Sequence, residues 1–113
     1  MEKDYVSNWI AQVKKGILSF VVLKILKGKE YYGYELISEV KQLSRYDIAE
    51  GTLYPLLDRL KREGLVVSEW VEQPTGIPRK YYRITEKGET TLEMMSEHWI
   101  NITTNINRLN EKR

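Results

Sequence analysis

The hydrophobic positions of the chain follow two different periods, and these periods predict where helices and strands lie. Apolar residues recur at helical spacing over residues 6–26, 31–43 and 50–63. The second half of the first segment is apolar on nearly all sides, which predicts burial by its own domain and by a second subunit. Gly28 and Gly64 follow the first and third segments. We expect them to end those helices, because glycine readily takes the left-handed cap conformation.

The third helical segment, EGTLYPLLDRLKREGLVV at residues 50–67, is the one around which the chain is organised. Its apolar stripe and its charged face are separate: Leu53, Leu56, Leu57 and Leu60 form the stripe, and Asp58, Arg59, Lys61, Arg62 and Glu63 lie off it. Pro55 is expected to lie in the first turn of a helix that starts near Glu50. Proline is tolerated there, because the backbone N–H groups of the first turn have no hydrogen-bond acceptor within the helix. Gly51 leaves backbone amides open at that start, where they can meet a phosphate. The pattern fits a DNA recognition helix or an ordinary solvated helix.

The segments beside this helix favour the first interpretation. A turn at residues 44–49 precedes it, which gives the order helix, turn, helix. Two runs of strand-forming residues follow it, at 65–72 and 79–85, and QPTGIP joins them as a hairpin loop. A hairpin directly after a recognition helix is a wing. Period-two alternation places Tyr82 and Ile84 on the packed face and predicts that Arg79 and Lys80, beside the loop, contact phosphates or the minor groove.

The last segment is predicted to be a helix with an apolar seam. Thr85 precedes it and can cap its first turn. The seam residues recur at alternating spacings of three and four, as in a coiled coil: Leu92, Met95, Trp99, Ile102, Ile106 and Leu109. Such a long seam needs a cover, so we predict a homodimer held by these residues. The alternative is a seam packed within its own subunit.

Composition and charge limit the possible functions. The chain has 113 residues with 42% hydrophobic and 30% charged residues, as expected of one compact domain plus an extra helix. Its net charge is only +2, but residues 74–83 carry three basic groups and no acid. There is no cysteine and one histidine, His98. We therefore expect no enzyme, no metal and no cofactor, and the absence of a signal peptide or an apolar span predicts a cytoplasmic protein without a membrane.

The combination of motifs resembles the PadR family of bacterial transcriptional regulators over nearly the whole chain. The motifs that carry the resemblance are Tyr32-Gly33-Tyr34-Glu35, Gly51-Thr52-Leu53-Tyr54-Pro55, Arg59-Leu60, Gly64-Leu65, Arg79-Lys80-Tyr81-Tyr82, and Thr85 with Gly88. The resemblance implies a mainly α fold with a small β-hairpin. A winged helix-turn-helix DNA-binding domain would span residues 1–85, and a single C-terminal dimerisation helix would span 86–113. It further implies a dimer that represses genes and leaves its double-stranded DNA operator when a small molecule binds.

The resemblance also implies roles for single residues. Thr52, Leu53 and Tyr54 would begin the reading helix, with Gly51 at its start and Arg59 on its charged face. Arg79 and Lys80 would be the wing contacts. Tyr34 would contact a phosphate, although the sequence alone leaves a core position equally open.

Two further questions stay open at this level. Trp99 resembles the position at which some members hold a flat aromatic effector between tryptophans at the dimer centre, but a tryptophan on a seam can also simply pack. The small net charge would also permit a winged-helix module that binds protein and not DNA.

Overall fold

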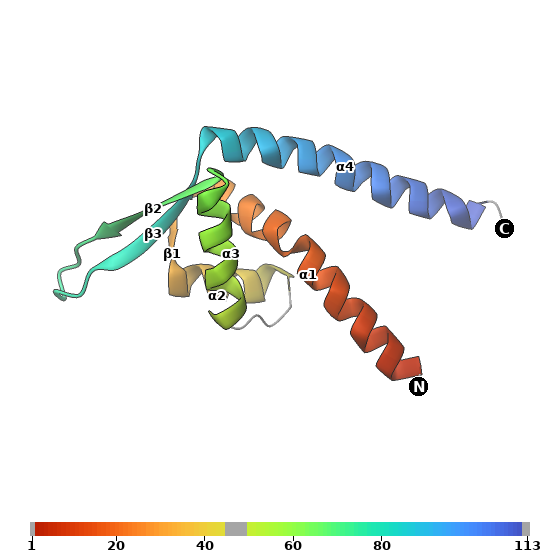
Figure 1. Cartoon of the computed structure of the whole chain (residues 1–113), viewed down its shortest axis with the longest axis horizontal. Helices are drawn as coiled ribbons and strands as arrows, with labels where there is room; N and C mark the ends of the chain where they lie inside the picture. Colours follow the sequence, from red (N-terminus) through yellow and green to blue (C-terminus); the bar gives the residue numbers. More distant parts are fainter. Residues whose placement is uncertain (1, 45–49, 112–113) are drawn as a thin grey trace.

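Four helices and a small antiparallel sheet form the parts of the chain that the structure, a computed structural model, describes: residues 2–44 and 50–111. The fold class predicted from the sequence is therefore confirmed (Figure 1). In chain order the elements are α1 (Glu2–Gly28), β1 (Tyr31–Tyr32), α2 (Gly33–Ser44), α3 (Glu50–Arg62), β2 (Val66–Val71), β3 (Arg79–Ile84) and α4 (Glu86–Glu111). The predicted turn at 44–49 lies almost wholly outside the described residues.

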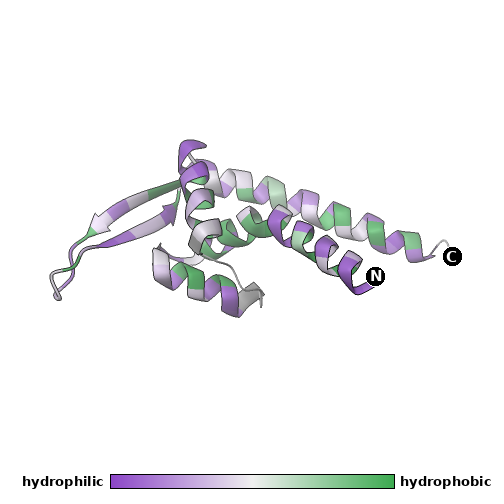
Figure 2. Ribbon diagram, turned by 60° about the horizontal axis from the view of Figure 1, so that its bottom comes forward, coloured by the Kyte–Doolittle hydropathy of each residue, from purple (hydrophilic) through white to green (hydrophobic). Residues whose placement is uncertain are grey.

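The core lies where the second half of α1 meets α2, α3 and the sheet. Leu23, Leu36, Leu53 and Leu57 are fully buried there, together with Val66 of β2. Burying one such leucine side chain contributes about 1.5–3 kcal/mol, so these contacts hold the three helices together. Figure 2 shows hydrophobic positions along the helices, while the hairpin that extends from the body is mostly hydrophilic or neutral.

The sheet differs from the prediction at one point. Residues 31–32 were expected to open the second helix, but they form the short strand β1, and α2 begins at Gly33. β1 pairs antiparallel with β3, in the register Tyr31 to Tyr82, and β2 pairs with the other edge of β3. The strand order is thus β1-β3-β2. The third strand ties the base of the wing to the start of α2.

The boundaries of α3 agree with the sequence, but the place of Pro55 does not. The helix starts at Glu50 as predicted, and Pro55 is its sixth residue, so the proline lies beyond the first turn. Since proline has no amide hydrogen, the carbonyl of Gly51 lacks the usual bond from position 55. At the other end Gly64 has a φ of 77°, and Leu65 donates an amide hydrogen bond to the Leu60 carbonyl. This is the predicted left-handed cap.

α4 leaves the body next to the sheet and diverges from α1 toward the two chain ends (Figure 1). Its seam is buried only at its beginning. Leu92 is 3% exposed and belongs to the subunit's own core, so its assignment to a dimer interface is wrong. Met95 is partly buried beside it, and exposure then rises along the helix, from 39% at Trp99 to 62% at Leu109. No helix within the described residues is long and apolar enough to cross a membrane.

Candidate nucleic-acid interface

Three segments that are distant in sequence meet around one open hollow of about 480 Å³. The start of α2, the middle of α3 and the wing strands contribute the residues that line it: Tyr32, Gly33, Tyr34, Tyr54, Asp58, Trp70, Arg79, Lys80 and Tyr82. Four residues predicted to bind DNA are therefore neighbours: Tyr34, Tyr54, Arg79 and Lys80. We call this surface the wing–helix face.

Aromatic rings hold the two wing cations on this face. The Arg79 guanidinium carbon lies 4.3 Å from the centre of the Tyr32 ring. Lys80 Nζ lies 5.8 Å from the ring centres of both Trp70 and Tyr82. Such contacts attract a cation through the ring quadrupole while leaving its hydrogen-bond donors available at the edge. The two wing cations are thus restrained by ring contacts, and the carboxylate of Asp58 lines the same hollow.

A close approach between α2 and α3 fixes the floor of the hollow. A Cβ atom at Gly33 would lie 2.5 Å from Tyr54 Oη and 2.9 Å from Tyr54 Cε1. A larger residue would fit there only if Tyr54 or the start of α2 moved. Tyr82 lies below with 3% exposure. Burial, with Tyr54 and Asp58 nearby, raises the pKa of the Tyr82 hydroxyl above its ordinary 10.0, so the phenol is neutral at physiological pH.

Some of the residues predicted to contact DNA from α3 are exposed, and one is buried. Gly51, Thr52 and Arg59 are exposed. Leu53 lies at the beginning of this helix, as expected, but it is 0% exposed and packs in the core, so its side chain is not one that contacts DNA. The helical period itself required this, because Leu53 belongs to the apolar stripe that holds α3 against the body.

Tyr34 is 66% exposed at the start of α2, which excludes the core position that the sequence left open. Its hydroxyl is free to reach a partner beyond the surface of the chain. Sequence reasoning missed Tyr32 and Trp70, which hold the wing cations. The signal for Trp70 was its place in a strand of the predicted hairpin. Directly paired residues of two antiparallel strands lie on the same side of the sheet, and Trp70 pairs with Lys80.

A comparison of the sequence with known families gives one match over the core and most of this face. Residues 22–94 match the Transcriptional regulator PadR-like family. The chain belongs to the PadR family. This match covers α2, α3, the wing and the first third of α4, and it confirms the resemblance drawn from the motifs.

Solved PadR structures share the fold over nearly the whole chain. The PadR family transcriptional regulator from Eggerthella lenta is 33% identical, with a TM-score of 0.88 over 99% of this chain and 97% of that one. The PadR-like transcriptional regulator from Bacillus cereus is 37% identical, with a TM-score of 0.79 over 87% of this chain and 95% of that one. Among curated proteins, Transcriptional regulator Rv3488 of Mycobacterium tuberculosis is 44% identical over 71 residues, which are 63% of this chain and 64% of that protein.

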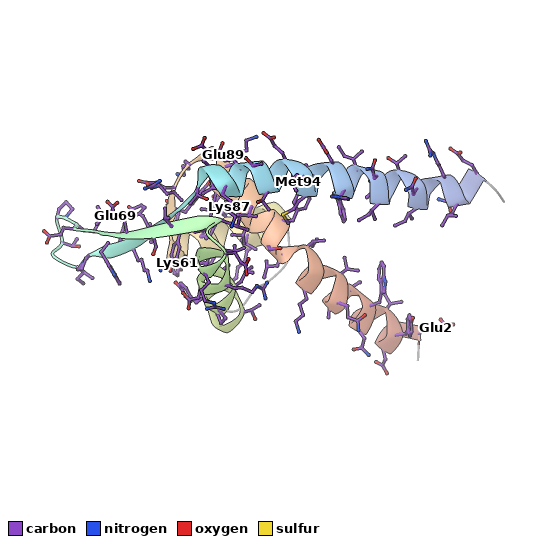
Figure 3. The ribbon with its side chains drawn as sticks, turned by 45° about the horizontal axis from the view of Figure 1, so that its top comes forward. Glu2, Lys61, Glu69, Lys87, Glu89 and Met94 are labelled. Atoms are coloured by element: carbon purple, nitrogen blue, oxygen red, sulfur yellow. The ribbon has the colours of Figure 1, made fainter. Side chains whose placement is uncertain are left out.

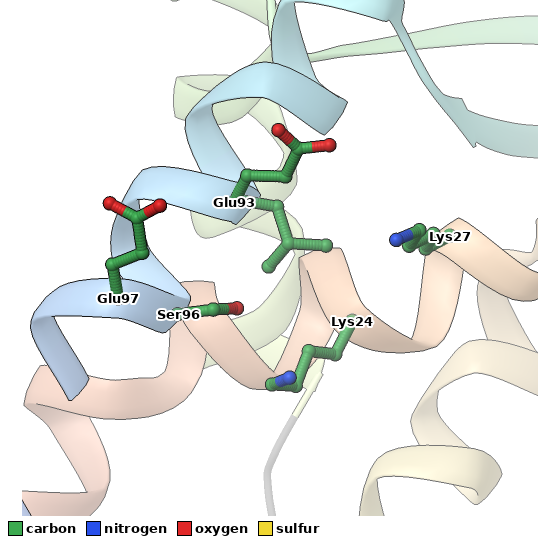
Figure 4. A pocket seen from close by; sticks show the side chains of 6 residues that line it. Lys24, Lys27, Glu93, Ser96 and Glu97 are labelled. Atoms are coloured by element: carbon green, nitrogen blue, oxygen red, sulfur yellow. The ribbon is translucent and has the colours of Figure 1, made fainter. Parts of the chain in front are cut away.

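In the described part of this PadR chain, two other hollows lie between α1 and α4. One, of about 430 Å³, is lined mainly by apolar side chains: Val13, Gly16, Ile17, Phe20, Met95, His98, Trp99 and Ile102. The Phe20 and Trp99 ring centres are 6.0 Å apart there. The other, of about 630 Å³, is lined by Lys24 and Lys27 of α1 and by Glu93 and Glu97 of α4 (Figure 4).

Proposed function

We propose that this PadR protein is a cytoplasmic, homodimeric repressor that binds a two-fold symmetric DNA operator and releases it when a small aromatic molecule binds. Residues 1–85 form the DNA-binding unit in this proposal, and residues 86–113 form the dimerisation helix. The proposal joins the family membership to the residues of the wing–helix face. No enzymatic step is part of it.

The observation that carries the proposal is the placement of two cations beside the middle of α3 and the exposed start of α2. Arg79 and Lys80 project from the wing, and Thr52 and Tyr34 are exposed on the adjoining helices. Arginine, lysine and hydroxyl donors contact phosphates, while side chains at the start of a recognition helix contact base edges in the major groove. The wing–helix face would supply the phosphate contacts, and the exposed start of α3 would supply the base contacts.

The dimer would be held by the part of the α4 seam that its own subunit leaves uncovered. Trp99, Ile102, Ile106 and Leu109 are 39–62% exposed on one stripe. An exposed apolar stripe of this length marks an interaction site. A second copy presents the same stripe, and a symmetric pair would place two reading helices in successive major grooves, about 34 Å apart.

The effector would enter the apolar groove between α1 and α4. Trp99 forms one wall, and Phe20 faces it at a ring-centre distance that suits aromatic packing. A flat aromatic compound could stack on Trp99 in this groove. The groove borders the α4 seam, so a bound compound would change how the two subunits pack. This change would lower the affinity of the dimer for the operator.

The test is selection of bound duplexes from a random-sequence pool, followed by footprinting. We expect a recovered site with two inverted half-sites and protection on both. Binding without sequence preference, or protection of a single half-site by a monomer, would contradict the proposal. The absence of any bound DNA at low salt would instead favour a module that binds protein.

A second experiment tests release. Planar aromatic compounds are titrated against the protein–duplex complex, with Trp99→Phe and Trp9→Phe as matched variants. We expect release from the parent and from Trp9→Phe, and a weaker response from Trp99→Phe. An equal response in all three would exclude stacking on Trp99.

A further inference from the structure

The end of α3 and the beginning of α4 meet at a hydrogen-bonded junction, which we call the α3–α4 joint. A relay runs through one hydroxyl group: the Gly88 amide donates to Thr85 Oγ1 at 2.9 Å, and Thr85 Oγ1 donates to the Gly64 carbonyl at 2.7 Å. Thr85 therefore caps the first turn of α4 and at the same time bonds to the residue that caps the end of α3.

Three further contacts close the joint. Lys87 Nζ donates to the Glu63 carbonyl at 2.8 Å, next to the negative end of the α3 dipole. The Thr85 amide donates to the Leu65 carbonyl at 3.0 Å. Gly88 is so close to that carbonyl that a Cβ atom would collide with it. Figure 3 shows Lys87 where α4 begins, beside the end of α3.

These contacts fix direction as well as distance. The last carbonyls of a helix usually bond to water or to a local cap. Here the first turn of α4 supplies donors to the carbonyls of Glu63 and Gly64. Leu92 also holds α4 to the body, but its apolar contacts have no preferred angle. The hydrogen bonds, which depend steeply on angle, orient the first turn of α4 relative to α3, while Met95 and Trp99 pack toward α1 further along the helix.

A small change of angle at this joint has a large effect at the far end of α4. The helix has 26 residues, and at 1.5 Å per residue it is about 39 Å long. A rotation of about 10° at its start displaces its end by about 7 Å, which is the rise of roughly two base pairs. In a dimer joined along α4, the same rotation changes the separation of the two reading helices.

We propose that Thr85 is a positioning residue that sets the angle between α3 and α4 and thereby selects the spacing between the two half-sites of the operator. This proposal rests on the proposed function, because it requires a dimer that grips two half-sites. It adds a determinant of specificity that does not touch DNA. The hydroxyl is the essential group, since it alone can donate to Gly64 and accept from Gly88 at once.

The test uses three substitutions. Thr85→Val removes the hydroxyl and keeps the shape, while Thr85→Ser keeps the hydroxyl. Thr90→Val is the matched control, because the Thr90 hydroxyl donates only to Glu86 in its own helix, at 3.3 Å. Circular dichroism establishes that each variant is folded at the temperature used.

The first readout does not require DNA. The chain has no cysteine, so Arg62→Cys in α3 and Asn107→Cys in α4 give two unique spin-label sites. Labelled chains are diluted with unlabelled chains, so that only one subunit of a dimer carries labels. We expect one narrow interlabel distance in the parent, Thr85→Ser and Thr90→Val, and a broader or shifted distance in Thr85→Val. An unchanged distance in Thr85→Val would overturn the proposal.

The second readout measures affinity for duplexes in which the two selected half-sites are moved apart or together one base pair at a time. The parent should prefer one spacing. Thr85→Val should lose about fivefold to tenfold in affinity at that spacing, as expected for one or two lost hydrogen bonds, and should discriminate less among the others. A spacing preference equal to that of the parent would overturn the role of Thr85 in specificity. If no variant binds DNA, the proposed function fails, while the distance measurement still decides whether Thr85 holds the joint.

Discussion

The Arg79 guanidinium carbon lies 4.3 Å from the centre of the Tyr32 ring. The contact joins the wing to the short strand β1, which pairs with β3 immediately before α2 begins. Tyr32 also meets Tyr81 edge to face, at 5.7 Å between ring centres. A ring in this position limits the freedom of the Arg79 side chain. The wing is thus ordered before any partner arrives, and binding loses less conformational entropy.

Replacing Tyr32 should therefore weaken DNA binding without unfolding the chain. Tyr32→Leu removes the ring, and we expect about a twofold to fivefold loss of affinity, the size of an exposed cation–π contact. Tyr32→Phe keeps the ring and should bind like the parent. Tyr5→Leu, at an exposed residue near the start of α1, is the control. Fluorescence anisotropy with the selected duplex measures the effect, and equal affinities for Tyr32→Leu and the parent would show that the ring does not order Arg79.

Gly33→Ala should destabilise the fold. The new methyl group would collide with the Tyr54 ring, so that Tyr54 or the start of α2 must move. Overpacking of this kind costs about 1–3 kcal/mol. Gly16→Ala is the matched variant, since nothing lies within 4 Å of a Cβ there and alanine favours a helix interior by about 0.5–1 kcal/mol. The midpoint of urea denaturation should therefore be lower for Gly33→Ala and higher for Gly16→Ala than for the parent. Shifts in the same direction would contradict the packing described.

The uncovered part of the α4 seam should hold the dimer. Truncating a buried isoleucine costs about 2–5 kcal/mol, so Ile102→Ala with Ile106→Ala should convert much of the dimer to monomer if a second copy covers them. Thr104→Ala, on the opposite side of the helix, should leave the dimer intact. Sedimentation velocity over a range of concentrations distinguishes the two. An undisturbed dimer in the double variant would place the interface elsewhere.

The buried Tyr82 hydroxyl should make stability depend on pH at the alkaline end. Its folded-state pKa is raised above 10.0, chiefly by burial, so folding favours the protonated form. Its contribution is complete below pH 10 and is lost as the pH rises through the raised folded-state pKa. The free energy of unfolding of the parent should therefore fall more steeply above pH 10 than that of Tyr82→Phe. Parallel curves would mean that burial of this hydroxyl has no effect on its ionisation.

Sequence patterns predicted the helices and the wing strands well, because each has a long stretch of one period. They failed for Tyr31 and Tyr32, since two residues are too few to show alternation and their partners lie far along the chain in β3. α1 likewise begins at Glu2, four residues before the predicted start at Val6. Those first residues are exposed and show no apolar period.

The candidate site was predictable in its cations but not in what holds them. Arg79 and Lys80 follow from charge placement beside a predicted loop, whereas Tyr32 acts through a ring contact between strands distant in sequence. Leu92 was assigned to a dimer interface although it lies in the subunit's own core, and Leu53 lies at the beginning of the reading helix with its side chain in the core. Spacing shows that a residue lies on an apolar stripe, but it does not show whether the subunit itself or a partner covers that stripe.

The most direct test of the account is the salt dependence of DNA binding in the parent and in Arg79→Ala with Lys80→Ala. Affinity for the selected duplex and for an unrelated duplex is measured over a series of salt concentrations. If both side chains contact phosphates, the double variant should bind both duplexes more weakly. The slope of log affinity against log salt should then fall by about two units, roughly one for each lost contact. A slope equal to that of the parent would contradict the assignment of the wing–helix face as the DNA-binding surface.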